Sequence, residues 1–166
     1  MIKIAIFSDS HGDVDTMRGV VGSEKFDVAI HLGDHINDAD KLSDEYPDIQ
    51  MFKVLGNTDS QNEDEEWVKY AEIDGKRFMM THGHTFIDNA ENFFQAQQKM
   101  YMDSGNVDIV LYGHTHEPFI NCCSGKWLMN PGRIGRSREQ GKLNPVYGVL
   151  EIDEAGVLHW QIAEVK

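Results

Sequence analysis

Cysteine and positive charge are both scarce in this sequence. The chain has two cysteines among 166 residues, the neighbours Cys122 and Cys123. A disulfide between adjacent residues closes almost no loop and is strained, so we expect no structural disulfide, which favours the cytoplasm. Lys and Arg together number 15 against 28 Asp and Glu, a formal net charge of −13. That balance argues against a protein that coats duplex nucleic acid and against binding to anionic membranes.

Long hydrophobic runs are also missing. The longer apolar stretches, such as residues 107–112 with Asp108 among them, fall far short of the roughly 20 residues that cross a bilayer. Residues 1–7 run directly into polar residues without a small-residue cleavage site. We therefore expect neither a membrane span nor a leader peptide. The length fits a single domain over residues 1–166.

Hydrophobic patterning predicts alternating strands and helices in the first half of the chain and hairpins in the second half. The expected strands of the first half are 1–7, 27–32 and 50–55, and the expected helices are 13–21 and 38–45. This β-α-β succession indicates a parallel sheet with helices packed on it. The expected elements of the second half are hairpins over 67–81, 119–129 and 147–162, a helix over 89–103 and a buried strand over 108–112. The combination predicts an α/β fold with mixed sheets.

Each strong strand is followed at once by a short polar cluster. The clusters are Asp9-Ser10-His11-Gly12, Gly33-Asp34, Gly56-Asn57-Thr58-Asp59, His82-Gly83-His84 and Gly113-His114-Thr115-His116. Because ligands of α/β proteins bind outside the carboxyl ends of the strands, these five clusters can converge on one site.

The residue types in these clusters suit a pair of divalent metal ions. Oxygen and nitrogen ligands from Asp, Asn and His bind Mn, Fe, Zn, Ni or Co at neutral pH. Residues two apart in an extended segment point the same way, so Asp9 and His11 can reach one ion, and so can His114 and His116. The absence of a thiolate argues against a structural zinc finger. A bound metal would also supply the positive charge that an anionic substrate needs in so acidic a chain.

Each cluster taken alone has a simpler interpretation. An Asp after a strand commonly caps a turn, and a single His-x-His is as consistent with a surface loop as with metal ligands. We expect His31, inside a strand, to be a core residue or to support a ligand, rather than to be one. We expect His35 to be a solvated loop residue and His159 to be structural.

The five clusters in this order resemble the motifs of the calcineurin-like metallophosphoesterases, most closely their small single-domain bacterial and archaeal phosphodiesterases. The matching motifs run from Asp9 to His116, and residues 130–132 (Asn-Pro-Gly) extend the match. The resemblance implies a four-layer α/β-β/α sandwich of two mixed β-sheets flanked by helices, the metallo-dependent phosphatase fold. It also implies two divalent ions, foremost Mn²⁺, with Ni²⁺, Fe²⁺, Zn²⁺ and Co²⁺ as alternatives.

The resemblance assigns the ligands position by position. The implied ligands are Asp9, His11 and His116 for the first ion, Asn57, His82 and His114 for the second, and Asp34 as a bridge between both. The implied reaction is hydrolysis of a small phosphoester, most typically a phosphodiester, by a hydroxide that the two ions share. Asn57 and His84 are the candidate catalytic residues and also candidate substrate ligands.

The sequence departs from the wider superfamily at two places. Many members have Gly-Asn-His-Glu, whose His is proposed to protonate the leaving group, whereas this chain has Thr58 and Asp59 after Asn57. The general acid is therefore left open. Arg133 stands where the family often has Ser, and with Arg136 and Arg138 it forms either an anion-binding edge or a solvated loop. We expect Arg133 to contact substrate.

Other functions fit the same motifs. A phosphomonoesterase or a nucleotide pyrophosphatase would use the same site, and specificity would depend on the rim, which we expect at residues 62–67, 86–92 and 133–141. The superfamily also contains a retromer subunit that serves as a non-catalytic scaffold. That subunit departs from the His of the first motif, which this chain keeps as His11. The resemblance further implies a homo-oligomer.

Overall fold

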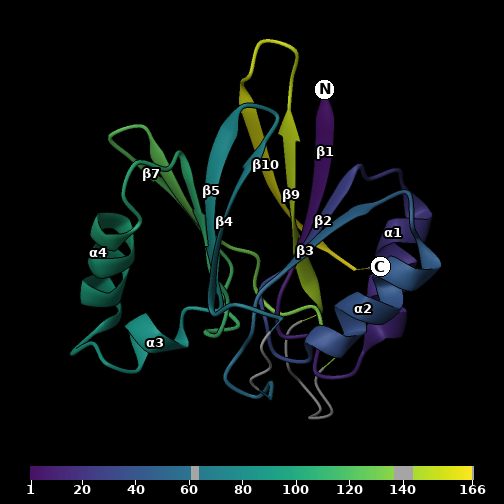
Figure 1. Cartoon of the computed structure of the whole chain (residues 1–166), viewed down its shortest axis with the longest axis horizontal. Coiled ribbons are helices and arrows are strands. Elements are labelled where there is room, and N and C mark those ends of the chain that lie inside the picture. The colour runs from purple at the N-terminus through teal and green to yellow at the C-terminus, as the bar shows by residue number, and fades with distance from the viewer. Residues whose placement is uncertain (61–63, 137–143, 166) are drawn as a thin grey trace.

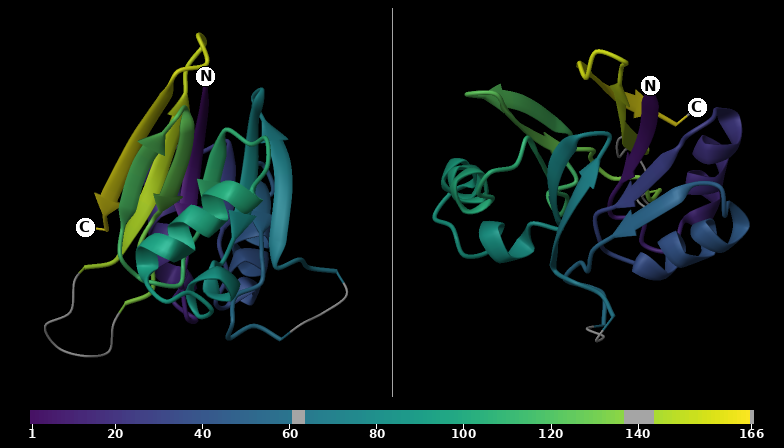
Figure 2. Two further views of the ribbon diagram at one scale, coloured as in Figure 1. Left: turned by 90° about the vertical axis from the view of Figure 1, so that its left-hand side faces the viewer. Right: turned by 45° about the horizontal axis from the view of Figure 1, so that its top comes forward.

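Two five-stranded β-sheets pack face to face, with helices on their outer sides (Figures 1 and 2). The computed structural model describes residues 1–60, 64–136 and 144–165. In chain order the elements are β1 (Ile2–Phe7), α1 (Val14–Ser23), β2 (Val28–His31), α2 (Ile36–Glu45), β3 (Gln50–Lys53), β4 (Val68–Ile73), β5 (Lys76–Thr81), α3 (His84–Ile87), α4 (Phe93–Asp103), β6 (Ile109–Leu111), β7 (Phe119–Cys123), β8 (Lys126–Asn130), β9 (Val146–Ile152) and β10 (Leu158–Glu164). The predicted sandwich of two mixed sheets is confirmed.

The first sheet has the strand order β10-β9-β1-β2-β3. Strands β1, β2 and β3 are parallel, with Ile4 opposite Val28, and α1 and α2 form the crossovers between them. Strand β9 returns antiparallel to β1 and pairs with β10 in a hairpin. The parallel part places the carboxyl ends of β1, β2 and β3 at one edge of the sheet.

The second sheet has the order β4-β5-β6-β8-β7. Its three central strands are parallel, and the hairpins β4–β5 and β7–β8 form its two sides. The predicted Asp-Gly turn is present, because Asp74 and Gly75 both have positive φ, at 48° and 73°. Ser124 and Gly125 turn the second hairpin in the same way, with φ of 50° and 81°. Two consecutive positive φ angles match the right-handed twist of the paired strands.

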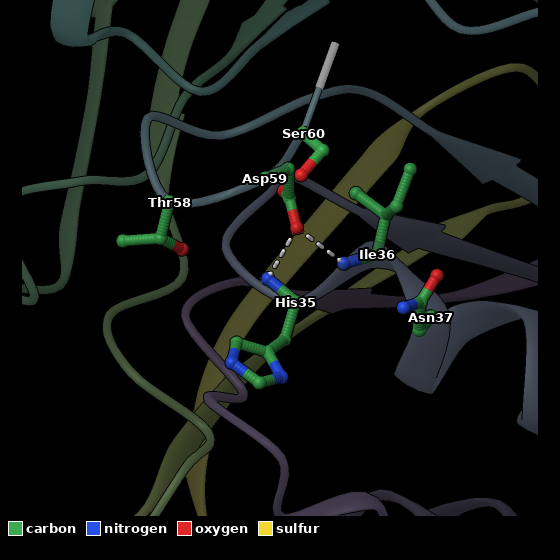
Figure 3. A pocket seen from close by; sticks show the side chains of 6 residues that line it. All are labelled: His35, Ile36, Asn37, Thr58, Asp59 and Ser60. Carbon is green, nitrogen blue, oxygen red and sulfur yellow. Dashed lines mark hydrogen bonds between the residues drawn. The ribbon is translucent and has the colours of Figure 1, made fainter. Parts of the chain in front are cut away.

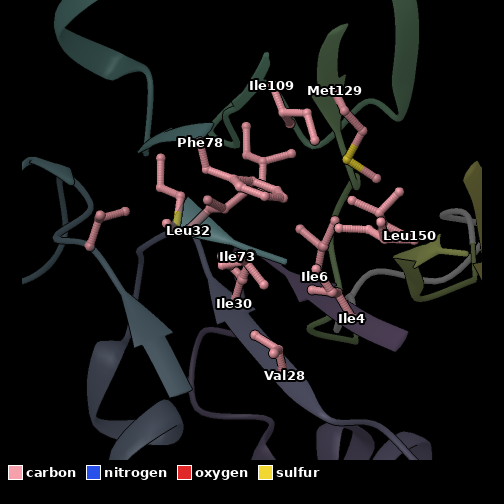
Figure 4. Packing of buried hydrophobic residues seen from close by; sticks show 14 residues of the cluster. Ile4, Ile6, Val28, Ile30, Leu32, Ile73, Phe78, Ile109, Met129 and Leu150 are labelled. Carbon is pink, nitrogen blue, oxygen red and sulfur yellow. The ribbon is translucent and has the colours of Figure 1, made fainter. Parts of the chain in front are cut away.

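The hydrophobic core has three parts, one between the two sheets and one between each sheet and its helices. Ile4, Ile6 and Ile30 point between the sheets and pack against Phe78 and Met129 of the second sheet (Figure 4). The alternate residues of β1 point the other way, so that Ala5 and Phe7 pack under α1 and α2. A third cluster, which includes Met79, Met100 and Tyr112, lies between the second sheet and α4.

Two of the predicted helices begin at other residues than expected, and one short helix was not predicted. Helix α2 begins at Ile36 rather than residue 38. Helix α4 begins at Phe93 rather than residue 89, because the Asn92 side chain caps it by accepting the Gln95 N–H. The short helix α3 was not predicted, since four residues are too few for a periodic signal. Among the described residues, no helix has the length and apolar character needed to cross a membrane.

Candidate metal centre

The polar clusters of both sheets meet at one end of the sandwich, where the parallel strands end. Two groups of possible metal ligands form there among the described residues, and they share Asp9. One group adds His11 and His116 to Asp9, and the other adds Asp34 and His82. These five residues are separated by up to 107 positions in the sequence and come from both sheets, so only the packing of the two sheets brings them together.

Asp9 lies at the centre of the first group. Its side chain is fully buried, and its Oδ1 is 3.0 Å from His116 Nε2 and 3.8 Å from His11 Nε2. Its Oδ2 accepts hydrogen bonds from the Ser8 hydroxyl at 2.5 Å and from the His114 backbone N–H at 3.2 Å. Burial alone would raise the pKa of Asp9, but the hydrogen bond with His116, the charge of His82 and the Ser8 hydroxyl together lower it. The carboxylate is therefore held in its anionic form.

Asp34 lies between two histidines. Its Oδ2 is 3.7 Å from His11 Nε2, and its Oδ1 is 3.4 Å from His82 Nε2. The Oδ1 also accepts the Thr58 backbone N–H at 3.1 Å. The two carboxylate oxygens thus face the first and the second group respectively, as a bridging position requires.

His82 turns its Nε2 toward oxygen atoms of the site. Its ring is fully buried, and Nδ1 is 2.7 Å from the Leu32 carbonyl oxygen. A carbonyl can only accept, so Nδ1 carries a proton, and Nε2 is the ring nitrogen that faces the site. It lies 2.9 Å from Asn57 Oδ1 and 3.4 Å from Asp34 Oδ1. Three possible ligand atoms therefore surround one small volume.

His114 and His84 line the side of the site formed by the second sheet. The His114 ring centroid is 5.1 Å from that of His82, and its Nε2 is 2.9 Å from Asp88 Oδ1, which leaves Nδ1 as its available nitrogen. The His84 ring lies 5.5 Å from that of His82 and 5.0 Å from that of Trp67. Burial lowers the pKa of His84, and the neighbouring His82 and His114 lower it further.

Two buried polar atoms near the site have no partner. Within the described part of the chain, the buried side-chain atoms without a hydrogen bond are His84 Nδ1, Arg133 Nε and Trp160 Nε1. Two of these three belong to residues that the sequence analysis names as substrate ligands. Burial lowers the pKa of His11, and the positive charge of Arg133 acts in the same direction while Asp34 and Asp9 oppose it. Arg138 lies outside the described residues.

The backbone at the site is strained. Among the described non-glycine residues, positive φ angles occur at Asp9, His11, Asp34, His35, Asp74, His114, His116 and Ser124. Two of these form hairpin turns, and five of the other six are predicted metal ligands. Each such conformation costs of order 1–3 kcal/mol and persists where the surrounding structure requires it, which is typical of functional sites.

Glycines beside the ligands let the loops approach closely. A Cβ at Gly56 would lie 2.2 Å from Asp34 Oδ1, and one at Gly113 would lie 1.9 Å from the Ser8 hydroxyl. Any side chain at these positions would therefore displace a carboxylate or its partner.

A hydrogen-bonded chain beneath the site was not predicted. The Ser10 hydroxyl lies 2.9 Å from His31 Nε2 and donates to Asp38 Oδ2 at 2.8 Å, and Asp38 also accepts the Gly12 N–H at 2.8 Å. His31 and Asp38 are both fully buried. This confirms the expectation that His31 is a core residue, and the network fixes the loop that carries Asp9. Ser10 and Asp38 carry no motif that would have revealed it.

A pocket beside the site is lined by residues outside the predicted rim. A pocket of about 300 Å³ beside the site is lined by His35, Ile36, Asn37, Thr58, Asp59 and Ser60 (Figure 3). None of these residues lies in the predicted rim, because the turn after β2 and the loop after β3 become neighbours only in the folded chain. Residues 62–63 and 137–141 of the predicted rim lie outside the described residues. His35 is exposed, as expected, and His159 is exposed and bonded to Asp153, away from every cluster.

An α/β sandwich with clustered carboxylates and histidines at its strand ends is typical of metal-dependent hydrolases. A family model described as the calcineurin-like phosphoesterase superfamily domain matches residues 2–155, and the chain therefore belongs to that superfamily.

Known proteins of the superfamily resemble the chain over most of its length. It is 29% identical over 160 residues to a probable metallophosphoesterase of Mycoplasma pneumoniae, which covers 95% of this chain and 94% of that relative. It is 29% identical over 147 residues to Phosphodiesterase MJ0936 of Methanocaldococcus jannaschii, covering 79% of this chain and 83% of the relative. The solved structure of an archaeal phosphodiesterase is also similar, with a TM-score of 0.69 and 26% identity, and the match covers 98% of this chain and 100% of the archaeal chain.

Proposed function

We propose that this protein is a phosphodiesterase that uses two divalent metal ions, foremost Mn²⁺. The observation that carries the proposal is the arrangement around His82, where an imidazole nitrogen, a carboxylate oxygen and an amide oxygen face one another. Electron-rich atoms repel one another at this distance unless a cation or a proton lies among them. The donor set of oxygen and imidazole nitrogen, without thiolate, fits Mn²⁺ and the other first-row ions.

Seven residues would hold the two ions. We assign Asp9, His11 and His116 to one ion, Asn57, His82 and His114 to the other, and Asp34 to both. When bound, the ions supply Lewis acidity toward the phosphoryl oxygens and toward water. The side chains supply the framework. Leu32 fixes the tautomer of His82, and Asp88 holds His114 by its Nε2.

His84 and Arg133 would bind the phosphate. Each has a buried nitrogen without a partner among the described residues, and such a group is costly unless a ligand completes its hydrogen bonding. Arg133 would contribute a fixed positive charge on the His11 side, and His84 a hydrogen bond on the His82 side. Between them they would orient the phosphate toward the ions. Asn57 would contact both an ion and the substrate.

The choice of a diester rests on the relatives. The similar protein of M. jannaschii is named a phosphodiesterase, and the similar archaeal structure is described as one. A phosphomonoesterase or nucleotide pyrophosphatase would use the same metal ligands, so only the preferred substrate distinguishes the three activities. We also propose that the enzyme works in the cytoplasm on a small phosphoester and assembles as a homo-oligomer.

The deciding experiment compares substrates and metal states in one preparation. Bis-p-nitrophenyl phosphate, p-nitrophenyl phosphate and a dinucleoside polyphosphate are assayed with Mn²⁺ and after treatment with EDTA. We expect metal-dependent turnover that is highest on the diester. Equal activity with and without metal would overturn the metal mechanism, and a preference for the monoester would overturn the diesterase. Metal below one ion per chain with no hydrolysis of any ester would instead indicate a scaffold.

A further inference from the structure

The loop after β3 holds a carboxylate that binds four backbone N–H groups. Asp59 Oδ1 accepts the N–H of His35 at 2.8 Å and of Ile36 at 2.9 Å (Figure 3). Its Oδ2 accepts the N–H of Asp34 at 2.9 Å and of Gly56 at 2.8 Å. Both carboxylate oxygens are thus fully engaged by the backbone, and the side chain is only partly exposed.

These four N–H groups belong to the two loops that carry Asp34 and Asn57. Asp34 and His35 have left-handed φ angles of 62° and 75°, so the N–H groups of residues 34–36 turn toward the same side. Successive N–H groups in this conformation form a concave site for an anion. In this protein the anion is the side chain of Asp59, which comes from the neighbouring loop.

Asp59 also supplies the capping hydrogen bond that the N-cap residue of α2 does not make. His35 occupies the N-cap position of α2, and its side chain makes no capping hydrogen bond. The N–H of Ile36, the first residue of α2, is instead satisfied by Asp59. A carboxylate at this end of a helix is stabilised by the helix dipole as well as by the hydrogen bonds.

The backbones of the two loops are in close contact. A Cβ at Gly33 would lie 2.6 Å from the Gly56 nitrogen, and one at Gly56 would lie 2.2 Å from the Asp34 nitrogen. The Asp34 carboxylate lies in the same contact, because its Oδ1 accepts the Thr58 N–H. Any movement of the Asp59 loop therefore moves both Asp34 and Asn57.

We propose, resting on the function proposed above, that Asp59 is a positioning residue that holds Asp34 and Asn57 in the geometry that binds the metal ions. It is neither a metal ligand nor a substrate contact in this role. Its effect passes through the backbone of the two loops.

The test measures metal binding in Asp59→Asn and in a matched control. The amide keeps the size of the side chain, but it offers one acceptor and turns an NH₂ group toward backbone N–H donors. Asp153→Asn is the control, because the Asp153 Oδ1 accepts the backbone N–H of Ala155 and Val157, both at 2.9 Å, in the β9–β10 hairpin. Titration of the metal-free proteins with Mn²⁺ is followed by calorimetry, and the thermal midpoint of each metal-free protein is recorded.

We expect Asp59→Asn to weaken binding of at least one Mn²⁺ by about 30-fold or more, and Asp153→Asn to leave binding within about threefold of the wild type. Both variants lose a backbone clamp, so both should lower the thermal midpoint, and only the change in metal affinity separates positioning from general stability. Wild-type affinity in Asp59→Asn would overturn the proposal. Failure of the wild type itself to bind Mn²⁺ would overturn the proposed function instead.

A measurement on the wild type keeps the proposal testable if Asp59→Asn does not fold. Hydrogen exchange of the amides of Asp34, His35, Ile36 and Gly56 should be slow, and Mn²⁺ should slow all four together. Fast exchange of these amides in the metal-loaded protein would show that the clamp does not hold the loops.

Discussion

Trp127 of β8 and Trp160 of β10 pack against each other across the two sheets, with ring centroids 5.7 Å apart and planes inclined by 38°. Both side chains are half-buried at the margin of the central core. Because β10 is the edge strand of the first sheet, this pair ties an edge of one sheet to the other. Offset aromatic pairs contribute about 0.5–1.5 kcal/mol beyond the area that they bury.

We therefore expect Trp160→Ala to lower the free energy of unfolding by about 2–4 kcal/mol, slightly less than for a fully buried tryptophan. Urea unfolding of Trp127→Ala, Trp160→Ala and the double variant gives the coupling between the two rings, which should be about 1 kcal/mol. His159→Gln, one residue away and exposed, is the matched control. Additive effects of the two Trp variants would contradict a direct contribution of the ring pair.

Asp34→Asn should reduce metal binding and turnover more than the loss of an ordinary ligand does. An amide cannot bridge two ions through two anionic oxygens, and the change removes one negative charge between two dications. We expect loss of at least one metal ion and a fall in turnover of at least ~10³-fold. Metal content and hydrolysis of bis-p-nitrophenyl phosphate measure both effects, with circular dichroism as the folding control.

His159→Gln serves again as the comparison for Asp34→Asn. Its side chain bonds Asp153 in the β9–β10 hairpin, outside every cluster. Its turnover and metal content should stay close to those of the wild type. An Asp34→Asn protein with two ions and most of its activity would show that the site is not arranged as proposed.

Metal removal should destabilise the folded protein. Ions that bind only the folded state stabilise it by mass action, about 2.7 kcal/mol for a ligand at 100 times its dissociation constant. We expect EDTA to lower the thermal midpoint of the wild type and to have a smaller effect on Asp34→Asn, which keeps at most one ion. Differential scanning calorimetry with and without Mn²⁺ measures the shift. Equal midpoints of the wild type in both conditions would contradict the proposed centre.

The metal-free protein should lose stability as the pH falls from about 6.5 toward 4. Burial lowers the pKa of His31 from 6.5 to about 4, although Asp59, Asp9 and Asp38 oppose the shift. The unfolded chain takes up a proton at this residue near pH 6.5, whereas the folded protein does so only near pH 4. The unfolded state therefore binds more protons between these values, and the free energy of unfolding decreases by up to about 3 kcal/mol.

His31→Gln removes this titration and keeps a side-chain N–H for Ser10. Urea unfolding of the EDTA-treated wild type and variant between pH 7 and 4.5 checks the prediction. We expect a flatter pH dependence for the variant and an unchanged one for His159→Gln. An equally steep decline in His31→Gln would assign the effect to other groups.

The sequence predicted the elements that have a strong local signal. Strand β1 and the hairpin turn at Asp74-Gly75 follow from hydrophobic alternation and from residues that accept positive φ. The short helix α3 was missed because four residues are too few for a periodic signal. The beginning of α4 was missed because side-chain capping by Asn92, rather than periodicity, fixes that boundary. The candidate ligands were readable because each one lies in the short polar segment that follows a strand.

The sequence by itself determined the candidate ligands, their order and the family, since strand-end motifs are local and the chemistry of Asp, Asn and His does not depend on the fold. Only the tertiary structure decided what supports them. Asp59 binds Asp34 from 25 residues away, and Asp38 reaches Ser10 across 28. A carboxylate that clamps a distant backbone leaves no periodic or motif signal, because its partners are N–H groups that every residue except proline has. Such contacts arise when the sheets and loops pack, so they are visible only in the folded chain.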